Sequence, residues 1–213
     1  MRRLFRGSLL LAGACMLAPA AGRAQTTPGP DASPKIAADL AVTYNTERAE
    51  LAPGACGCFW LKGVGIDTAL SLRNGIGIAA GFNTGRAGKV APGIDVEKIQ
   101  YVAGPRYTFT AHSKTAEPRA RLQLFGQALF GGVRGFNGAY PSPTGLKSEA
   151  YSYAIEAGGG ANLLLAEGFG LRLIEADYVR TALPNNASNT QSDARIAFGL
   201  TWRFRAFSGG ALR

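Results

Sequence analysis

The sequence predicts an all-β fold, an eight-stranded antiparallel up-and-down transmembrane β-barrel. Three observations predict it. Apolar residues alternate with small or polar residues in eight separate segments, as in strands whose two faces meet different surroundings. The connections between these segments are alternately long and short. Glycine is abundant, with 29 of the 213 residues, which disfavours a helical bundle.

The chain begins with an expected signal peptide, residues 1–24. Arg2, Arg3 and Arg6 precede a short apolar run, and small residues then lead to Ala24. This order is typical of a secretory signal, and the apolar run is too short for a membrane-spanning helix. We therefore expect export and cleavage after Ala24.

Other processing sites stay open. Ala18-Pro19-Ala20 also fits the small-x-small rule, and Cys15 follows three small residues that loosely match a lipoprotein cleavage box. The expected organisation after the signal is a flexible lead-in, a barrel domain and a C-terminal tail, over residues 25–35, 36–204 and 205–213.

Much of the basic charge belongs to the signal peptide. The whole chain has 23 basic and 14 acidic residues, and loss of the four arginines in residues 1–24 leaves 19 basic residues and a net charge of +5. The remaining lysines and arginines form no run. We therefore expect no nucleic-acid partner.

The eight segments have one apolar face each, which defines the expected strands. Phe125 and Leu129 are exceptions, because they fall on the polar side of their segment. The apolar faces consist of Leu40, Val42 and Tyr44; Val64, Ile66, Leu70 and Leu72; Ile76, Ile78, Ala80 and Phe82; Ile99, Tyr101, Ala103, Tyr107 and Phe109; Leu122, Leu124, Ala128 and Phe130; Tyr151, Tyr153, Ile155, Ala157 and Leu163; Leu171 and Leu173; and Ile196, Phe198, Leu200, Trp202 and Phe204.

The segment 169–181 does not keep a single alternation. In one register Glu175 and Asp177 share the apolar face with Leu171 and Leu173. A one-residue β-bulge near Leu173–Ile174 resets the alternation. With this bulge Arg172 and both acids point to the polar side.

The connections are expected to be long at one end of the barrel and short at the other. Outer-membrane barrels have long extracellular loops and short periplasmic turns. The expected long loops are residues 46–58, 84–97, 134–149 and 182–192, and the expected short turns are 73–75, 111–118 and 165–168.

The polar face is expected to line the barrel interior. It consists mainly of small residues with single charges, which suits a narrow interior of paired ions better than a water-facing surface. The apolar face, with aromatic residues near strand ends, suits lipid. A soluble barrel with an apolar core is the alternative. The expected interior charge cluster consists of Arg106, Arg121, Glu156, Arg172, Glu175, Asp177 and Arg195, and Asp67 is a further charge on this face.

Several stretches resemble the outer-membrane β-barrel family related to the transmembrane domain of outer-membrane protein A. They include Gly104–Phe109, Phe125–Gly132, Ala157–Gly160, Arg172–Tyr178 and the closing Gly199–Phe204. The resemblance implies an eight-stranded barrel whose last aromatic strand is read by the barrel-assembly machinery. The chain departs from the family by continuing past its last strand, so either Phe204 or Phe207 closes that signal.

Candidate reactive residues are few. Cys56 and Cys58 are separated by one glycine, and a local disulfide, free thiols and a metal site all stay open. His112 lies in an expected short turn, away from serines and acids of the long loops, and is interpreted as solvated. We expect no catalytic residues, no metal and no cofactor.

The sequence therefore favours a non-enzymatic outer-membrane barrel with an envelope-structural or surface-interaction role through four extracellular loops. Expected partners are outer-membrane lipid and the barrel-assembly machinery, and we expect a monomer. The alternative is a small-molecule or lipid-handling barrel, including a lipid-modifying enzyme. The sequence identifies no loop partner.

Overall fold

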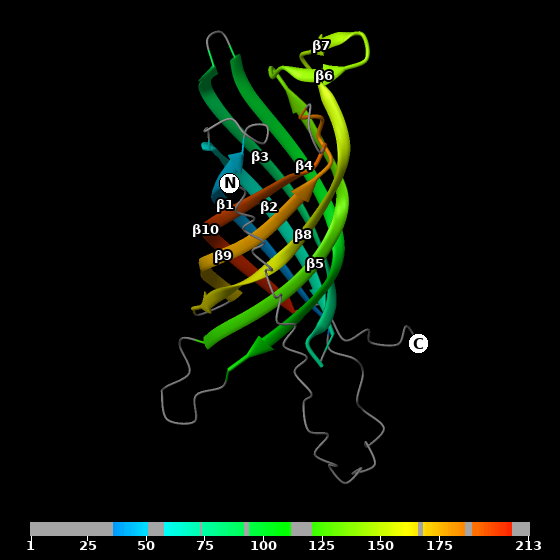
Figure 1. Cartoon of the computed structure of the whole chain (residues 1–213). Coiled ribbons are helices and arrows are strands. Elements are labelled where there is room, and N and C mark those ends of the chain that lie inside the picture. The colour runs from blue at the N-terminus through cyan, green and yellow to red at the C-terminus, as the bar shows by residue number, and fades with distance from the viewer. Residues whose placement is uncertain are drawn as a thin grey trace, which may run out of the picture. The chain divides into compact units, whose positions relative to one another are not determined.

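The computed structural model is a closed antiparallel barrel of eight strands (Figure 1). It describes residues 36–50, 58–72, 74–91, 94–111, 121–165, 168–185 and 189–205. The barrel strands are β1 (Ala37–Glu50), β2 (Cys58–Ser71), β3 (Ile76–Ala91), β4 (Ile94–Thr110), β5 (Arg121–Phe136), β8 (Ala150–Leu164), β9 (Phe169–Thr181) and β10 (Gln191–Arg205). The predicted fold class is confirmed.

The strands follow one another around the barrel in chain order, and β1 pairs with β10 to close it. Every strand is therefore paired on both sides, which removes the free edges of an open sheet. We call the end with connections 51–57, 92–93, 137–149 and 182–190 the loop end, and the opposite end the turn end. Among the described residues, no helix is long and apolar enough to cross a membrane.

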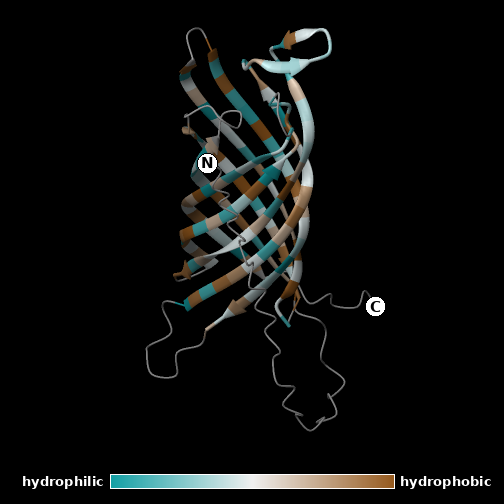
Figure 2. Ribbon diagram, viewed as in Figure 1, coloured by the Kyte–Doolittle hydropathy of each residue, from teal (hydrophilic) through white to brown (hydrophobic). Residues whose placement is uncertain are grey.

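Side chains alternate between the two faces as predicted. The hydropathy of successive residues changes along each strand in Figure 2. Large apolar side chains point outward, and Ile78 and Phe130 are both 63% exposed. Polar side chains such as Asn45, Gln100 and Arg172 are buried inside. The apolar face is thus the outer face of the barrel.

The predicted bulge in β9 is present. The β9–β10 register shifts between the Glu175–Ala197 and Arg172–Gly199 pairs, so two residues of β9 lie opposite one of β10. Those two, Leu173 and Ile174, are both exposed. Because the extra residue resets the alternation, the residues that follow it keep their polar side chains inside.

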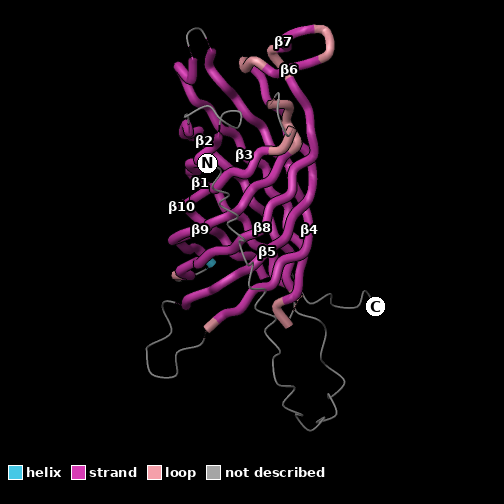
Figure 3. Tube along the Cα trace, in the orientation of Figure 1, coloured by secondary structure: helices cyan, strands magenta, loops and turns pink. Residues whose placement is uncertain are grey.

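The expected long loops are shorter than predicted. Figure 3 shows strand continuing far into the loop end. β3 reaches Ala91 and β4 starts at Ile94, so the predicted loop 84–97 is wrong and is mostly a paired hairpin. The predicted loop 134–149 holds a small two-stranded hairpin, β6 (Tyr140–Ser142) and β7 (Gly145–Lys147). The glycines and charged residues of these segments favoured loops. The backbone groups nevertheless pair across strands, because strand preference depends more on context than on composition.

Phe125 and Leu129, the exceptions in the pattern of β5, are interior residues. Both are buried. Leu129 joins an apolar cluster inside the barrel with Val102 and Val133, and Tyr140 and Leu183 from the loop-end connections pack on it. The loop-end half of the interior is therefore filled partly by apolar side chains.

Candidate functional site

The outer surface is a belt of exposed apolar side chains contributed by all eight barrel strands. Aromatic residues lie toward both ends of this belt. At the loop end they include Trp60 and Tyr151, and at the turn end Tyr107, Phe109 and Phe204. An apolar belt with aromatic residues at its borders is typical of a barrel surrounded by lipid.

The interior contains a continuous ion-pair network, which begins with two arginines that share one acid. Arg106 makes a two-pronged contact with Asp67, with N–O distances of 2.8 and 2.7 Å. Arg172 Nη2 lies 3.1 Å from the same carboxylate, and its Nη1 lies 2.7 Å from Glu175 Oε2. Arg172 Nε also donates to Asn162 Oδ1 at 3.1 Å. Bonds to charged groups of this kind are the strongest hydrogen bonds in proteins.

Gln127 connects these arginines to the other half of the network. Its Oε1 accepts from Arg106 Nε at 3.0 Å, while its Nε2 donates to Glu175 at 2.9 Å and to Asp177 at 3.2 Å. Arg195 then bridges Asp177, at 3.0 Å, and Glu156, at 2.6 Å. The network thus reaches across the barrel from β2 to β10 and fixes the strands relative to one another.

Phe125 packs against the two arginines that open the network. The guanidinium carbon of Arg106 is 4.5 Å from the ring centroid, and that of Arg172 is 4.7 Å away. A ring with a cation near it inside a water-poor interior gains electrostatic attraction as well as packing. The aromatic residue that breaks the sequence pattern is therefore part of the interior network.

The structure brings together most of the predicted charge cluster. Six of its members lie in the network: Arg106, Glu156, Arg172, Glu175, Asp177 and Arg195. Arg121 does not belong to it, and this assignment was wrong. Arg121 shares the inward face of β5 but is its first residue, at the open turn end, where it is exposed. Asp67 and Gln127 are members that the predicted cluster lacked.

A second group of charges lies nearer the loop end and was not predicted. Lys98 of β4 contacts Glu47 of β1 and lies 3.2 Å from Asp193 Oδ2 of β10. All three side chains are buried. This group was missed because Glu47 and Asp193 fall at or next to expected loops. The signal that identifies Glu47 as an interior residue is the alternation of Asn45, Glu47 and Ala49, which continues the inward face of β1.

A cavity of about 250 Å³ adjoins this second group of charges. Apolar side chains form most of its wall, including Leu61, Val96 and Leu183, and Lys98 and Asp193 lie at its polar side. Tyr140 from β6 also lines it, and burial raises the pKa of this phenol. Ligand pockets typically measure about 300–1,000 Å³, so this cavity is small for an organic ligand.

The interior carboxylates are already occupied by donors. Oxygen atoms of Glu156, Glu175 and Asp177 lie within 4.8 Å of one another, a spacing that suits a metal ion. Gln127 Nε2, however, lies 2.9 to 3.3 Å from an oxygen of each, and Arg172 and Arg195 pair with them. Their arrangement is that of counter-ions that hold the barrel together.

The remaining candidate residues lie at the edges of the described chain. Cys58, the first residue of β2, is an exposed free thiol, and Arg48 Nη2 donates to its sulfur at 3.1 Å. Cys56 and His112 lie outside the described residues, so the local disulfide and the solvated histidine stay predictions.

A closed eight-stranded barrel with an apolar outside and a charged, filled inside decides the architecture. By fold, the chain is an antiparallel up-and-down β-barrel. No family model matches the chain, and no curated protein does either.

Solved structures similar to the chain share low sequence identity with it. Ail, the attachment invasion locus protein of Yersinia pestis, is 16% identical over 79% of this chain and 98% of that chain, with a TM-score of 0.46. Neisserial surface protein A is 13% identical over 79% and 97%, with a TM-score of 0.48. The N-terminal β-barrel domain of Pseudomonas aeruginosa OprF is 12% identical over 78% and 97%, with a TM-score of 0.40. These similarities assign no role to any residue.

Proposed function

We propose that the chain resides in the bacterial outer membrane as a non-enzymatic, monomeric barrel. Its role is envelope-structural or surface interaction through the loop end, which faces outside. The observation that carries the proposal is the exposed apolar belt on all eight strands around a closed, charged interior. In water such a belt far exceeds the apolar patches of soluble monomers, whereas lipid stabilises it.

The filled interior supports a structural role. An eight-stranded barrel is just wide enough for its own side chains, and here the ion-pair network and the apolar cluster occupy that space. The interior acids have donors around them, which suits a scaffold better than a hydrolase. The last strand, which ends in Phe204 and Arg205, is the segment that the barrel-assembly machinery would read.

Membrane fractionation tests the proposal. We expect the mature chain in the outer-membrane fraction, extracted only by detergent, and we expect its gel migration to change on heating because a barrel resists detergent until it is boiled. Recovery of the chain as a soluble periplasmic monomer, without detergent, would contradict the proposal.

A further inference from the structure

β2 and β3 separate at the loop end and leave an opening in the barrel wall. Their register reaches the Lys62–Arg86 pair, whereas β2 stays paired with β1 as far as Glu50–Cys58. Beyond Lys62–Arg86 the described residues of β2 and β3 show no further pairs with each other. We call this opening, between residues 58–62 and 86–90, the β2–β3 seam.

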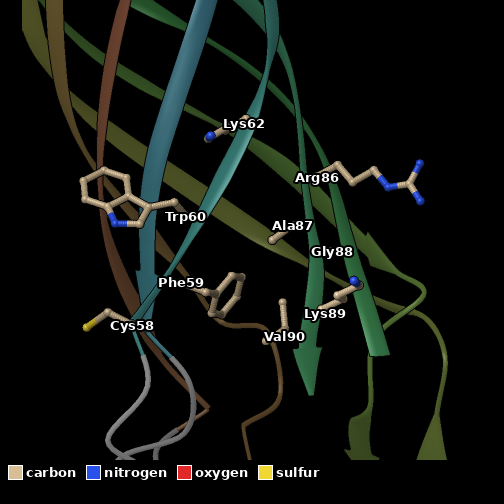
Figure 4. Close-up of a pocket in the computed structure, with 9 residues that line it drawn as sticks. All are labelled: Cys58, Phe59, Trp60, Lys62, Arg86, Ala87, Gly88, Lys89 and Val90. Carbon is tan, nitrogen blue, oxygen red and sulfur yellow. The ribbon is translucent and has the colours of Figure 1, made fainter. Parts of the chain in front are cut away.

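The seam contains a cavity of about 470 Å³ between the two strands. Figure 4 shows its lining, with Phe59 and Val90 between the diverging strands and Trp60 on the other side of β2. This volume falls within the usual range for pockets that hold organic ligands. Among the described residues, the backbone groups that face the seam have no strand partner there.

The seam carries more positive than negative charge. Arg86 has acidic partners, since its Nη2 lies 3.2 Å from Asp95 and its Nε 3.4 Å from Glu97. Lys62 and Lys89 also line the cavity, and neither ammonium group has a carboxylate partner among the described side chains. Two unneutralised cations therefore line the cavity.

The position of these cations relative to the apolar belt indicates what they meet. Lys62 lies between Trp60 and Val64 on the outer face of β2, and these neighbours are 51% and 58% exposed. Successive outward residues of a strand are about 7 Å apart. Lys62 is the charged residue next to Val64, the outward aliphatic residue of β2 nearest the loop end, and therefore lies at the border of the belt. In a bilayer this border is the level of the lipid headgroups.

We propose that the β2–β3 seam binds the anionic phosphate headgroup of a membrane lipid in the outer leaflet. Lys62 and Lys89 hold the phosphate, Trp60 packs against the headgroup region, and the acyl chains lie along Val64 and Ile66. Lysine binds phosphate as a point charge, and basic pockets at a membrane surface select anionic lipids. This inference rests on the proposed outer-membrane residence.

Trp60 provides the readout. The chain has two tryptophans, so Trp202→Phe leaves Trp60 as the only one. This variant, refolded into phosphatidylcholine bilayers, is titrated with phosphatidylglycerol whose acyl chains carry bromine, which quenches tryptophan fluorescence on contact. Brominated phosphatidylcholine in the same bilayers gives the reference. We expect phosphatidylglycerol to be enriched at Trp60 several-fold over phosphatidylcholine.

Charge removal tests the residues. Lys62→Gln and Lys89→Gln should each reduce the enrichment by up to about five-fold. Lys147→Gln is the matched control, because it removes an exposed lysine of β7 away from the seam, and it should leave the enrichment unchanged. A heat-dependent gel shift verifies that each variant is folded.

The outcomes separate the site from the membrane assignment. Equal quenching by both lipids, or an equal loss in the Lys147→Gln variant, overturns the seam but leaves the membrane residence intact. Displacement of the brominated lipid by inorganic phosphate identifies a free anion as the ligand and overturns the lipid assignment. A chain that quenches with neither lipid and does not float with the bilayers overturns the proposed function, and the seam with it.

Discussion

Replacement of Glu175 by leucine should lower the free energy of unfolding by about 3–5 kcal/mol, the cost of leaving one partner of a buried ion pair alone. The Glu175 side chain is 7% exposed and lies 2.7 Å from Arg172 Nη1. It also accepts a hydrogen bond from Gln127 at 2.9 Å. Leucine removes both contacts and leaves Arg172 with Asp67, which it shares with Arg106, as its ion-pair partner.

The chain offers a matched control at the same distance. Glu149 lies 2.7 Å from Arg134 Nη2, but these side chains are 48% and 43% exposed. Glu149→Leu therefore removes an ion pair of the same geometry that water already screens, and stability should change little. The comparison isolates burial, because the substitution and the N–O distance are the same.

Urea unfolding of the refolded barrel in detergent micelles, followed by tryptophan fluorescence, measures both variants. A double variant, Arg172→Met with Glu175→Leu, should regain part of the loss because no lone charge remains inside. A Glu175→Leu protein as stable as the parent, or more stable, would refute the reasoning and show that Glu175 faces lipid.

Three further outcomes are expected. Phe125→Ala should cost about 3–5 kcal/mol in the same assay, because it leaves a hole beside two guanidinium groups, and Phe130→Ala on the lipid-facing side should cost less. The pKa of Asp95 is held below 3.8 mainly by the Lys89 backbone N–H. The stabilising effect of this contact is therefore complete above pH 3.8 and is lost as the pH falls through the lowered pKa. Over that pH range, hydrogen exchange of the Lys89 amide should speed up beyond the change seen in unstructured peptides. In a Cys56→Ser variant, Cys58 should react on intact cells with a thiol reagent that cannot cross membranes. Labelling only after lysis would reverse the proposed orientation.

The strand faces were predictable because alternation is a local property. Each residue pair along β10, for example, reports its own face without knowledge of the rest of the chain. The bulge at Leu173–Ile174 was predictable for the same reason, since charged residues fell on the apolar side without it. Alternation along the chain thus predicted the barrel, its inward face and most of its interior arginines and acids.

Features that depend on the position of a residue along the barrel axis were not predictable. Arg121 has the right face but lies at the turn end, and alternation carries no information on that position. Lys98, Glu47 and Asp193 come from three strands far apart in the chain, so only the closed register brings them together. The long hairpin of β3 and β4 was missed because its glycines and charges resemble a loop.

The extra residue in β9 has a consequence for how the chain tolerates length changes. Deletions are usually harmless in loops and harmful in strands because of what they remove. Here the loss of either Leu173 or Ile174 would remove one exposed apolar side chain and the bulge with it, and the strict alternation that results would leave inside and outside unchanged for the rest of the strand. Loss of Ala176 would instead turn Asp177 toward lipid and Tyr178 into the narrow interior. A related chain one residue shorter at Leu173–Ile174 would therefore keep the same order of polar and apolar residues from there to the loop end.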